Sequence, residues 1–258
     1  MSPEPQTGPA NRIAAELRAA IADGRYQPGA QLPPVRDLAK QYGVSRNTAA
    51  KAINILRTEG AIVTRYGSGA YVRESHPIRT LGPDRYARSK WQETRVRAHG
   101  EDDGREKEQQ GTQAQEVEIV PAEEDVAVAL GVPIASLVVE RSRTVFRDGL
   151  PTHTMVSYYR PEEVRDTPIM DDRPGMAGRG GSFAILTDLG LAPQDVDEKL
   201  KARMPTTDEV DVLRLPPGEP VVELTRWIKT AEGYVVEYAK GVHAASRFEW
   251  LYSFPIPD

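Results

Sequence analysis

Apolar residues follow helical spacing in the first part of the chain. They recur at every fourth position from Ile13 to Ile21, which predicts an amphipathic helix over 11–22. A turn-rich stretch, YQPGAQLPP, follows. Residues 34–41 then predict a short helix with a proline near its first turn, where the missing N–H costs nothing.

A single glycine separates this short helix from the next one. Gly43 ends the first, and Ser45 can cap a helix that runs to about Thr58. Residues 61–72 alternate around a glycine-containing turn and predict two short strands. Helix, short helix, turn, helix and a two-stranded wing is the layout of a winged helix-turn-helix.

From residue 116 onward the pattern is that of strands, and it contains an internal repeat. Residues 121–151 resemble 204–235: each has an acidic helical stretch, a proline turn, a V-V-E strand, a charged turn with glycine and a second strand. This predicts a duplicated helix–hairpin unit. The expected fold class is α+β: a winged helix-turn-helix followed by an antiparallel sheet with helices on one side.

The domain layout follows from these patterns. We expect a flexible arm at 1–10, the winged helix-turn-helix at 11–75, a linker at 76–115 and a C-terminal domain at 116–258. The end of the predicted linker, EDDGREKEQQGTQAQ, is nearly devoid of apolar side chains and cannot bury a face.

Charge divides the chain unevenly. The net charge is −5, but residues 1–75 carry ten Lys and Arg against six Asp and Glu, a balance of +4, which leaves −9 for the rest. A basic end suggests a nucleic-acid contact there, with chance surface charge as an equal alternative. The absence of cysteine excludes disulfides and thiolate metal sites. No signal peptide or membrane-length apolar run is present, so we expect a cytoplasmic protein.

The third helix carries the residues expected to bind DNA. A major groove about 12 Å wide admits one helix, whose N-terminal residues reach base edges. Ser45, Arg46, Asn47 and Thr48 occupy that end. Arg46 can chelate guanine, Asn47 can pair with adenine or donate to phosphate, and Lys51 suits phosphate.

Further contacts are expected from the preceding helix and the wing. Arg36 can cross toward the backbone or the groove, and Arg65, Gly67 and Ser68 belong to the wing, where glycine allows close approach to a strand. Each residue alone is more often a solvated side chain or an ordinary hairpin. As an ordered set they favour DNA binding.

The C-terminal domain shows no sign of catalysis. Its histidines have no metal-ligand spacing, and no nucleophile motif or phosphate-binding loop is present. We therefore predict no catalytic residue, no metal ligand and no cofactor.

A binding site for a small anion is better supported. Arg141 and Arg143 are two apart on a strand and share a face, where an anion between them would relieve their repulsion. Ser182 lies at a glycine-rich helix start, and Glu237 and His243 can hydrogen-bond a ligand. An arginine–glutamate lattice on an exposed sheet is the plainer alternative.

The stretch LPPVRDLAKQYGVSRNTAAKAINILRTEGAIVTRYGSGAYV resembles the DNA-binding domain of GntR-family bacterial repressors. The match includes the G-V-S-R-x-T motif and both wing glycines, so it is specific. It departs at Ala50, where family members often have arginine. The resemblance implies DNA binding by a winged helix, with a different operator.

The C-terminal region resembles the UTRA domain of the HutC subfamily, which shares its fold with chorismate lyase. The matching stretches include LGVPIASLVVERSRTVFRDGLPTHTMVSYYRP and LPPGEPVVELTRWIKTAEGYVVEYAKGVHAASRFEW. The resemblance implies an effector pocket lined by Arg141, Arg143, Ser182 and Glu237. The chain departs from the family at Met155, often Glu, and at His243, often Tyr.

These observations predict a cytoplasmic, homodimeric transcriptional repressor that binds a pseudo-palindromic double-stranded operator. A small, anionic effector, a sugar phosphate or a carboxylate, would regulate it, with no membrane partner. One alternative is an effector-independent repressor of plasmid-transfer or autoregulatory type, whose C-terminal domain only dimerises. The other is a lyase-like enzyme fused to a DNA-binding domain.

Overall fold

The computed structural model describes residues 8–65, 67–74, 77–91, 113–172 and 181–256. Within that part of the chain the side chains of Arg65 and Gln113 are not described. The chain forms two compact units, divided between residues 77 and 78, except that Pro216–Glu219 group with the first unit.

The first unit is a winged helix-turn-helix, as predicted. Its elements are α1 (Pro9–Ala22), α2 (Val35–Tyr42), α3 (Arg46–Thr58), β1 (Ile62–Arg65) and β2 (Gly69–Val72). Helix α1 begins inside the predicted flexible arm, whose first seven residues lie outside the described part.

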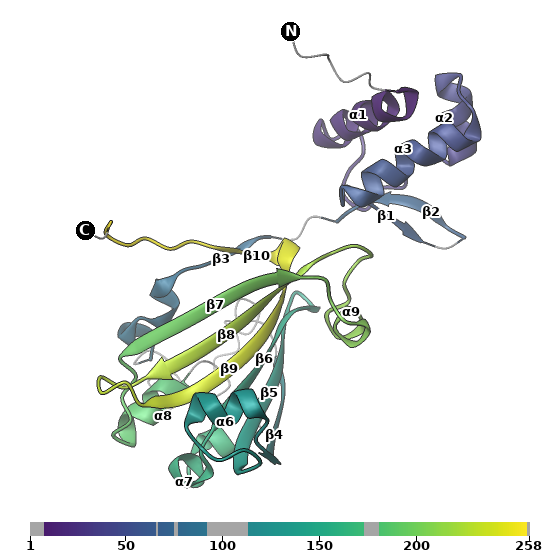
Figure 1. Ribbon diagram of the computed structural model, residues 1–258. Helices are drawn as coiled ribbons and strands as arrows, with labels where there is room; N and C mark the ends of the chain where they lie inside the picture. The colour runs from purple at the N-terminus through teal and green to yellow at the C-terminus, as the bar shows by residue number, and fades with distance from the viewer. Residues whose placement is uncertain (1–7, 66, 75–76, 92–112, 173–180, 257–258) are drawn as a thin grey trace. The chain divides into compact units, whose positions relative to one another are not determined.

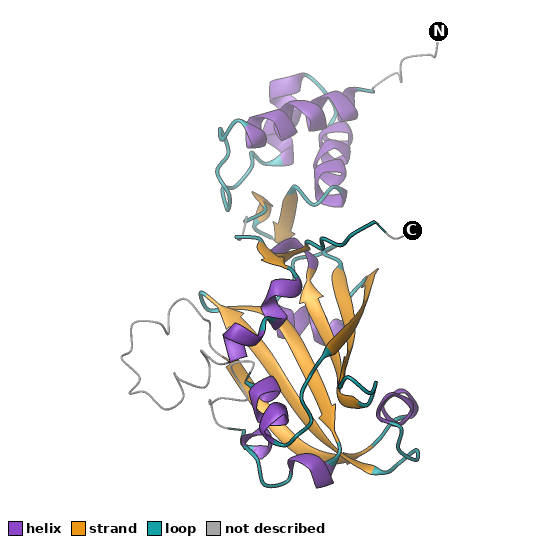
Figure 2. Cartoon of the chain, turned by 90° about the vertical axis from the view of Figure 1, so that its left-hand side faces the viewer, coloured by secondary structure: helices purple, strands orange, loops and turns teal. Residues whose placement is uncertain are grey.

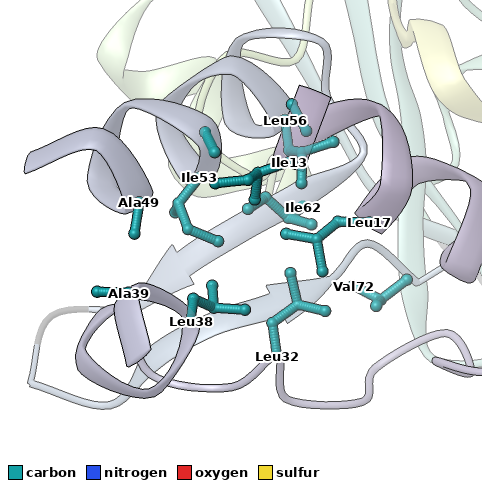
Figure 3. Packing of buried hydrophobic residues seen from close by; sticks show 12 residues of the cluster. Ile13, Leu17, Leu32, Leu38, Ala39, Ala49, Ile53, Leu56, Ile62 and Val72 are labelled. Atoms are coloured by element: carbon teal, nitrogen blue, oxygen red, sulfur yellow. The ribbon is translucent and has the colours of Figure 1, made fainter. Parts of the chain in front are cut away.

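The helices of this unit surround one apolar core. Ile13, Leu38 and Leu56, from three different helices, are each fully buried and meet there (Figure 3). Gly43 ends α2 with φ +61°, a left-handed conformation that favours glycine, and thereby sets the turn into α3. The apolar side of α3 is thus committed to the core.

The wing is wider than the two strands predicted. Residues 29–32 run beside β2: Gly29 N–H donates to Val72 O at 3.1 Å, and Leu32 N–H donates to Ala70 O at 2.8 Å. An isolated bridge joins Gln31 to Tyr71. The segment that leads into α2 therefore also forms the outer edge of the wing.

The second unit is built on a six-stranded antiparallel sheet (Figures 1 and 2). The six strands of this sheet are β4 (Gln113–Pro121), β5 (Leu137–Arg147), β6 (Leu150–Tyr159), β7 (Asp195–Arg203), β8 (Val221–Lys229) and β9 (Val235–Ala244). A separate two-stranded sheet consists of β3 (Arg79–Leu81) and β10 (Phe248–Trp250). Its helical elements are η1 (Pro83–Tyr86), α6 (Glu124–Leu130), α7 (Pro161–Val164), η2 (Pro168–Met170), α8 (Ser182–Asp188), α9 (Thr207–Leu213) and η4 (Ala245–Arg247).

The strand order β4-β5-β6-β9-β8-β7 confirms the predicted duplication. The units β4-α6-β5-β6 and β7-α9-β8-β9 have the same order of elements and meet where β6 pairs with β9. Each central hairpin also has one irregularity of register, between Val145 and Phe146 in the first half and between Ile228 and Lys229 in the second. The two halves are therefore equivalent residue by residue across their hairpins.

Helices cover both faces of this sheet, so the expectation of helices on one side is wrong. Helix α6 packs on the face that contains Val138, Tyr158 and Tyr238. On the other face Phe183 of α8 packs with Tyr86, the last residue of η1. The sequence indicated a helix starting near Ser182, but not that this helix covers the second face of the sheet.

The predicted linker, 76–115, overlaps the second unit. Within it, β3 pairs in parallel with β10, Tyr86 stacks on Phe183 at 5.9 Å, and Trp91 meets the same ring edge-on at 5.2 Å. Residues 92–112 lie outside the described part, and β4 begins at Gln113.

Candidate functional sites

The N-terminal end of α3 is fixed by a cap. Ser45 has extended backbone angles, and its Oγ accepts a hydrogen bond from Thr48 N–H at 3.1 Å. The hydroxyls of Ser45 and Thr48 also lie 2.9 Å apart. This cap holds the first turn of α3 in place but engages both hydroxyls, so we expect Ser45 and Thr48 to act mainly by positioning their neighbours.

The polar side of α3 is open. Arg46, Asn47, Ala50 and Lys51 are all exposed, whereas the opposite side of the helix is buried at Ala49, Ala52, Ile53 and Leu56. The free backbone N–H groups and the positive end of the helix dipole lie at the same end, where phosphate is favoured. The arrangement can present a guanidinium, an amide and an ammonium group to a DNA groove.

The preceding helix contributes an exposed cation. The Arg36 side chain is 74% exposed, and its only ion pair among described residues is the adjacent Asp37, at 3.2 Å. An ion pair this exposed contributes little stability in water, and the guanidinium can therefore leave Asp37 and bind a phosphate instead. The side chain of Arg65, also predicted to contact DNA, lies outside the described part.

The wing turn is held by two residues that the sequence did not single out. Gln31 Nε2 donates to Ser68 O at 2.6 Å, and the Tyr71 hydroxyl lies 2.5 Å from the Ser68 hydroxyl. Gly67 and Gly69 have φ of +69° and +111°, and a Cβ on Gly69 would come within 2.9 Å of Gln31 Nε2. Only glycine fits there, so the wing glycines shape the turn.

The two arginines of β5, Arg141 and Arg143, differ in their hydrogen-bond partners. Arg141 is 1% exposed, and its Nη atoms donate to Ile169 O at 2.7 Å, Asp171 O at 2.5 Å and Gln115 Oε1 at 2.8 Å. Arg143 makes one weak hydrogen bond, to Ser157 Oγ at 3.4 Å. The two share a face of β5, as predicted, but Arg141 is used to hold the chain near Ile169.

Glu237 lies at the centre of a buried polar network on the same face. It is fully buried and ion-paired with Arg226, which the sequence did not single out. Its carboxylate also accepts from Tyr159 Oη at 2.9 Å and from Ser157 Oγ at 3.1 Å. Burial alone would raise the pKa of Glu237, but the charges of Arg226 and Arg143 and these hydrogen bonds lower it, so the carboxylate is ionised.

The network continues to the edge of the sheet. Arg226 Nη1 donates to Tyr86 Oη at 3.4 Å, and the Tyr86 hydroxyl donates to Glu198 of β7. Glu198 pairs in turn with Arg85 at 2.5 Å and accepts from Tyr252 Oη at 2.6 Å. These residues were missed because their proximity depends on strand order, which spacing along the chain does not reveal.

His243 is packed among aromatic rings. It is 2% exposed and stacks in parallel on His153, with ring centroids 4.6 Å apart, while Phe248 and Trp250 meet it edge-on. Its Nδ1 is buried with no hydrogen-bond partner among the described atoms. The ring is therefore part of an aromatic cluster at this end of β9.

Ser182 is the first residue of α8, and its side chain is buried. Gly181 precedes it at the cap position, and Gly180 lies outside the described part. The predicted glycine-rich helix start is therefore described only from residue 181 onward.

Comparison with known proteins decides the family. The family model described as bacterial regulatory proteins, gntR family, matches residues 9–72, and the model of the UTRA domain matches residues 106–249, more than half of the chain. The chain belongs to the GntR family. The UTRA domain places it among the GntR members of HutC type, as the sequence motifs indicated.

Individual relatives align with nearly the whole length of this chain. An HTH-type transcriptional regulator of Streptomyces coelicolor is 43% identical over 96% of this chain and 92% of its own length. The transcriptional repressor NagR of Bacillus subtilis is 22% identical over 93% and 92%. A crystal structure of a GntR-family transcriptional regulator has a TM-score of 0.66 at 25% identity, covering 98% of this chain and 99% of that one.

Membership in the GntR family makes the chain a DNA-binding transcriptional regulator, not an enzyme. The α+β fold with a winged helix and a UTRA domain is confirmed by the same comparisons. In the described part of the chain no group of three or more acidic or histidine side chains could hold a metal ion. None of the helices described there could span a lipid bilayer.

Proposed function

We propose that this GntR member is a cytoplasmic repressor that binds a pseudo-palindromic operator as a homodimer and is regulated by a small anionic effector. The observation that carries the DNA-binding part is the capped, exposed N-terminal end of α3, together with a wing turn held by Gln31. A two-fold operator requires a two-fold protein, which supports the dimer. An effector releases DNA only through different affinities for two arrangements, with coupling of about 1–3 kcal/mol.

Arg46 and Lys51 are expected to differ in what they contribute to binding. Arg46→Ala should cost about 1–3 kcal/mol on the preferred sequence and little on random DNA, because it removes a base-edge contact. Lys51→Ala should weaken both duplexes alike and lower the salt dependence by about one phosphate contact. Fluorescence anisotropy at several salt concentrations, on duplexes selected by the protein from a random library, measures both.

Lys40 of α2 offers a matched control, because its side chain is exposed and lies outside the predicted contact set. Lys40→Ala should leave the preference for the selected duplex unchanged. Equal preference for selected DNA in Arg46→Ala and in the unmodified protein would contradict the assignment of α3.

Arg143 is the residue that the effector proposal rests on in the second unit, because Arg141 is already bonded to backbone carbonyls. A thermal-shift screen of sugar phosphates and small carboxylates should give hits that Arg143→Ala abolishes, since a charge-assisted bond contributes about 1.5–3 kcal/mol. Arg147→Ala, at an exposed position of the same strand, is the control and should retain them. Hits that survive Arg143→Ala would place the effector elsewhere.

One observation favours the effector-independent alternative. Arg141 and Glu237, two of the residues expected to bind ligand, already have internal partners for the Nη atoms of the arginine and for the carboxylate. A screen without hits, together with operator affinity that does not respond to metabolites from a cell extract, would support a UTRA domain that only dimerises.

A further inference from the structure

The duplication gives two arginines equivalent places in the sheet. Arg226 lies on β8 opposite Ala239, and Arg143 lies on β5 opposite Met155. In each strand the arginine precedes the register irregularity by the same number of residues. Arg143 is therefore the counterpart of Arg226 in the first half of the domain.

The acidic partner of Arg226 has a counterpart as well. Glu237 lies opposite Ile228, two residues beyond Arg226 on β8, and His153 lies opposite Val145, two residues beyond Arg143 on β5. The diagonal relation that lets Glu237 reach Arg226 thus exists between His153 and Arg143. The carboxylate is present in one half only.

The histidine does not replace the missing carboxylate. The His153 ring stacks on His243, and its Nδ1 lies 3.0 Å from Thr152 Oγ1. Arg143 has no ion pair with any described residue, and its single bond to Ser157 is 3.4 Å long. The first half therefore has a half-buried guanidinium whose counterpart is neutralised in the second half.

The surroundings of the two arginines also differ. Across the sheet from Arg143 the next positions are Met155, Gly241 and Leu224, and Met155 Cε lies 2.9 Å from where a Gly241 Cβ would stand. Met155 and Leu224 are buried in one apolar cluster. Methionine is flexible and adapts its shape to what it contacts.

We propose that the effector is a monocarboxylate with an apolar body, whose carboxyl group pairs with Arg143 as Glu237 pairs with Arg226. The proposal rests on the proposed function, since it names the ligand class of that effector site. A guanidinium binds a carboxylate through two parallel hydrogen bonds, which gives the pair a defined geometry. The ionised Glu237 lies close enough to feel the charge of Arg143 and would repel a phosphate dianion more than a carboxylate.

The first experiment needs no effector. His153→Glu introduces a carboxylate at the counterpart of Glu237, His153→Gln is its neutral match, and both are made with Arg143 and with Arg143→Met. The unfolding equilibrium constant is measured at pH 8 for each variant, and the constant of His153→Glu is divided by that of His153→Gln. This ratio should be about 10- to 100-fold lower when Arg143 is present than when it is replaced by methionine. Absence of this coupling in urea unfolding would overturn the proposed geometry.

The second experiment uses the full-length, unmodified chain, so it stands even if His153→Glu fails to fold. Matched acids, octanoate with octyl phosphate and benzoate with phenyl phosphate, are compared by thermal shift, with acetate and inorganic phosphate as simple ions. The apolar carboxylates should raise the midpoint, and Arg143→Ala should remove the rise.

The possible results distinguish a carboxylate effector from the more general proposal of an anionic effector. If only the phosphates stabilise the protein, and do so only when Arg143 is present, the effector site is supported but the carboxylate as its ligand is refuted. Stabilisation by acetate as strongly as by octanoate would overturn the apolar body. No response to any member would overturn the proposal and favour the effector-independent regulator.

Discussion

Replacing Arg226 by methionine is expected to lower the free energy of unfolding of the UTRA domain by about 3–5 kcal/mol, because it leaves a buried charge without its partner. Glu237 is 0% exposed and has Arg226 as its ion-pair partner. Tyr159 and Ser157 still donate to it, but hydroxyl groups do not neutralise a carboxylate. The loss should therefore exceed that of an ordinary truncation.

Urea unfolding followed by tryptophan fluorescence measures this loss in the full chain. All three tryptophans, Trp91, Trp227 and Trp250, belong to the second unit, so the signal reports that unit alone. Adding Glu237→Gln to Arg226→Met should restore most of the stability. Lys229→Met, which removes a pair with the 60% exposed Asp197, is the control and should cost at most about 1 kcal/mol.

The loss should also depend on pH. In the unmodified protein burial would raise the pKa of Glu237, but Arg226, Arg143 and the hydrogen bonds outweigh burial and hold it low. Without Arg226 the effect of burial gains weight, so the pKa in the folded variant rises above its value in the unfolded chain. Such a variant binds more protons when folded, and its deficit should grow from pH 5 to pH 7. A deficit independent of pH would contradict this account.

Acidification should destabilise the UTRA domain through its stacked histidines. Burial lowers the pKa of His243 to about 3, and it lowers the pKa of His153 in the same direction. Both rings are therefore neutral when folded but protonate in the unfolded chain below about pH 6.5. The contribution of the two neutral rings to the free energy of unfolding is fully present above that pH and is lost as the pH falls below it. For His243 alone the loss at pH 5 should be about 2 kcal/mol.

Cations around the two rings reinforce burial. A protonated His243 would lower the pKa of His153 further, and Arg79 of β3 and Arg143 of β5 do so with their permanent charges. For His243, Arg85 of η1 and Arg226 of β8 also lower the pKa, while Glu198 and a hydrogen bond with the backbone of Val222 oppose them. Glu198 is paired with Arg85, so it does not compensate for a protonated imidazole.

Urea unfolding at pH 8, 6 and 5 tests the pair. The unmodified protein should lose stability between pH 6.5 and 5, and His243→Phe, which keeps a flat ring in the stack, should lose about 2 kcal/mol less over that range. Glu249→Gln, on the neighbouring strand β10, is the control and should lose as much as the unmodified protein. Equal losses in all three proteins would show that other groups cause the acid response.

The sequence predicted the elements of both domains because each depends on local patterns. Apolar spacing located α1, and the G-V-S-R-x-T motif located the turn and start of α3. The repeat located both hairpins, since V-V-E and a glycine turn recur in each. Each of these signals lies within a single helix, strand or turn and does not depend on how the strands pair.

The partners of the site residues could not be predicted in this way. The face shared by Arg141 and Arg143 was predicted, but the carbonyls that bind Arg141 come from a segment about thirty residues away. Arg226 was overlooked because its diagonal contact with Glu237 depends on the register of the β8–β9 hairpin, and only the pairing of β6 with β9 adds Tyr159 to the same carboxylate. Spacing gives the face of a residue, whereas strand order gives its neighbours.

The bond between Gln31 and the wing turn has a mechanical consequence. Residue 31 lies just before α2, which packs on α3, so the turn at Ser68 is tied to the same rigid body as α3. In the proposed complex the distance between the contacts of α3 and those of the wing is therefore fixed, and the duplex must conform to it. Bases between those contacts would be selected for how readily they bend, without being touched by any side chain.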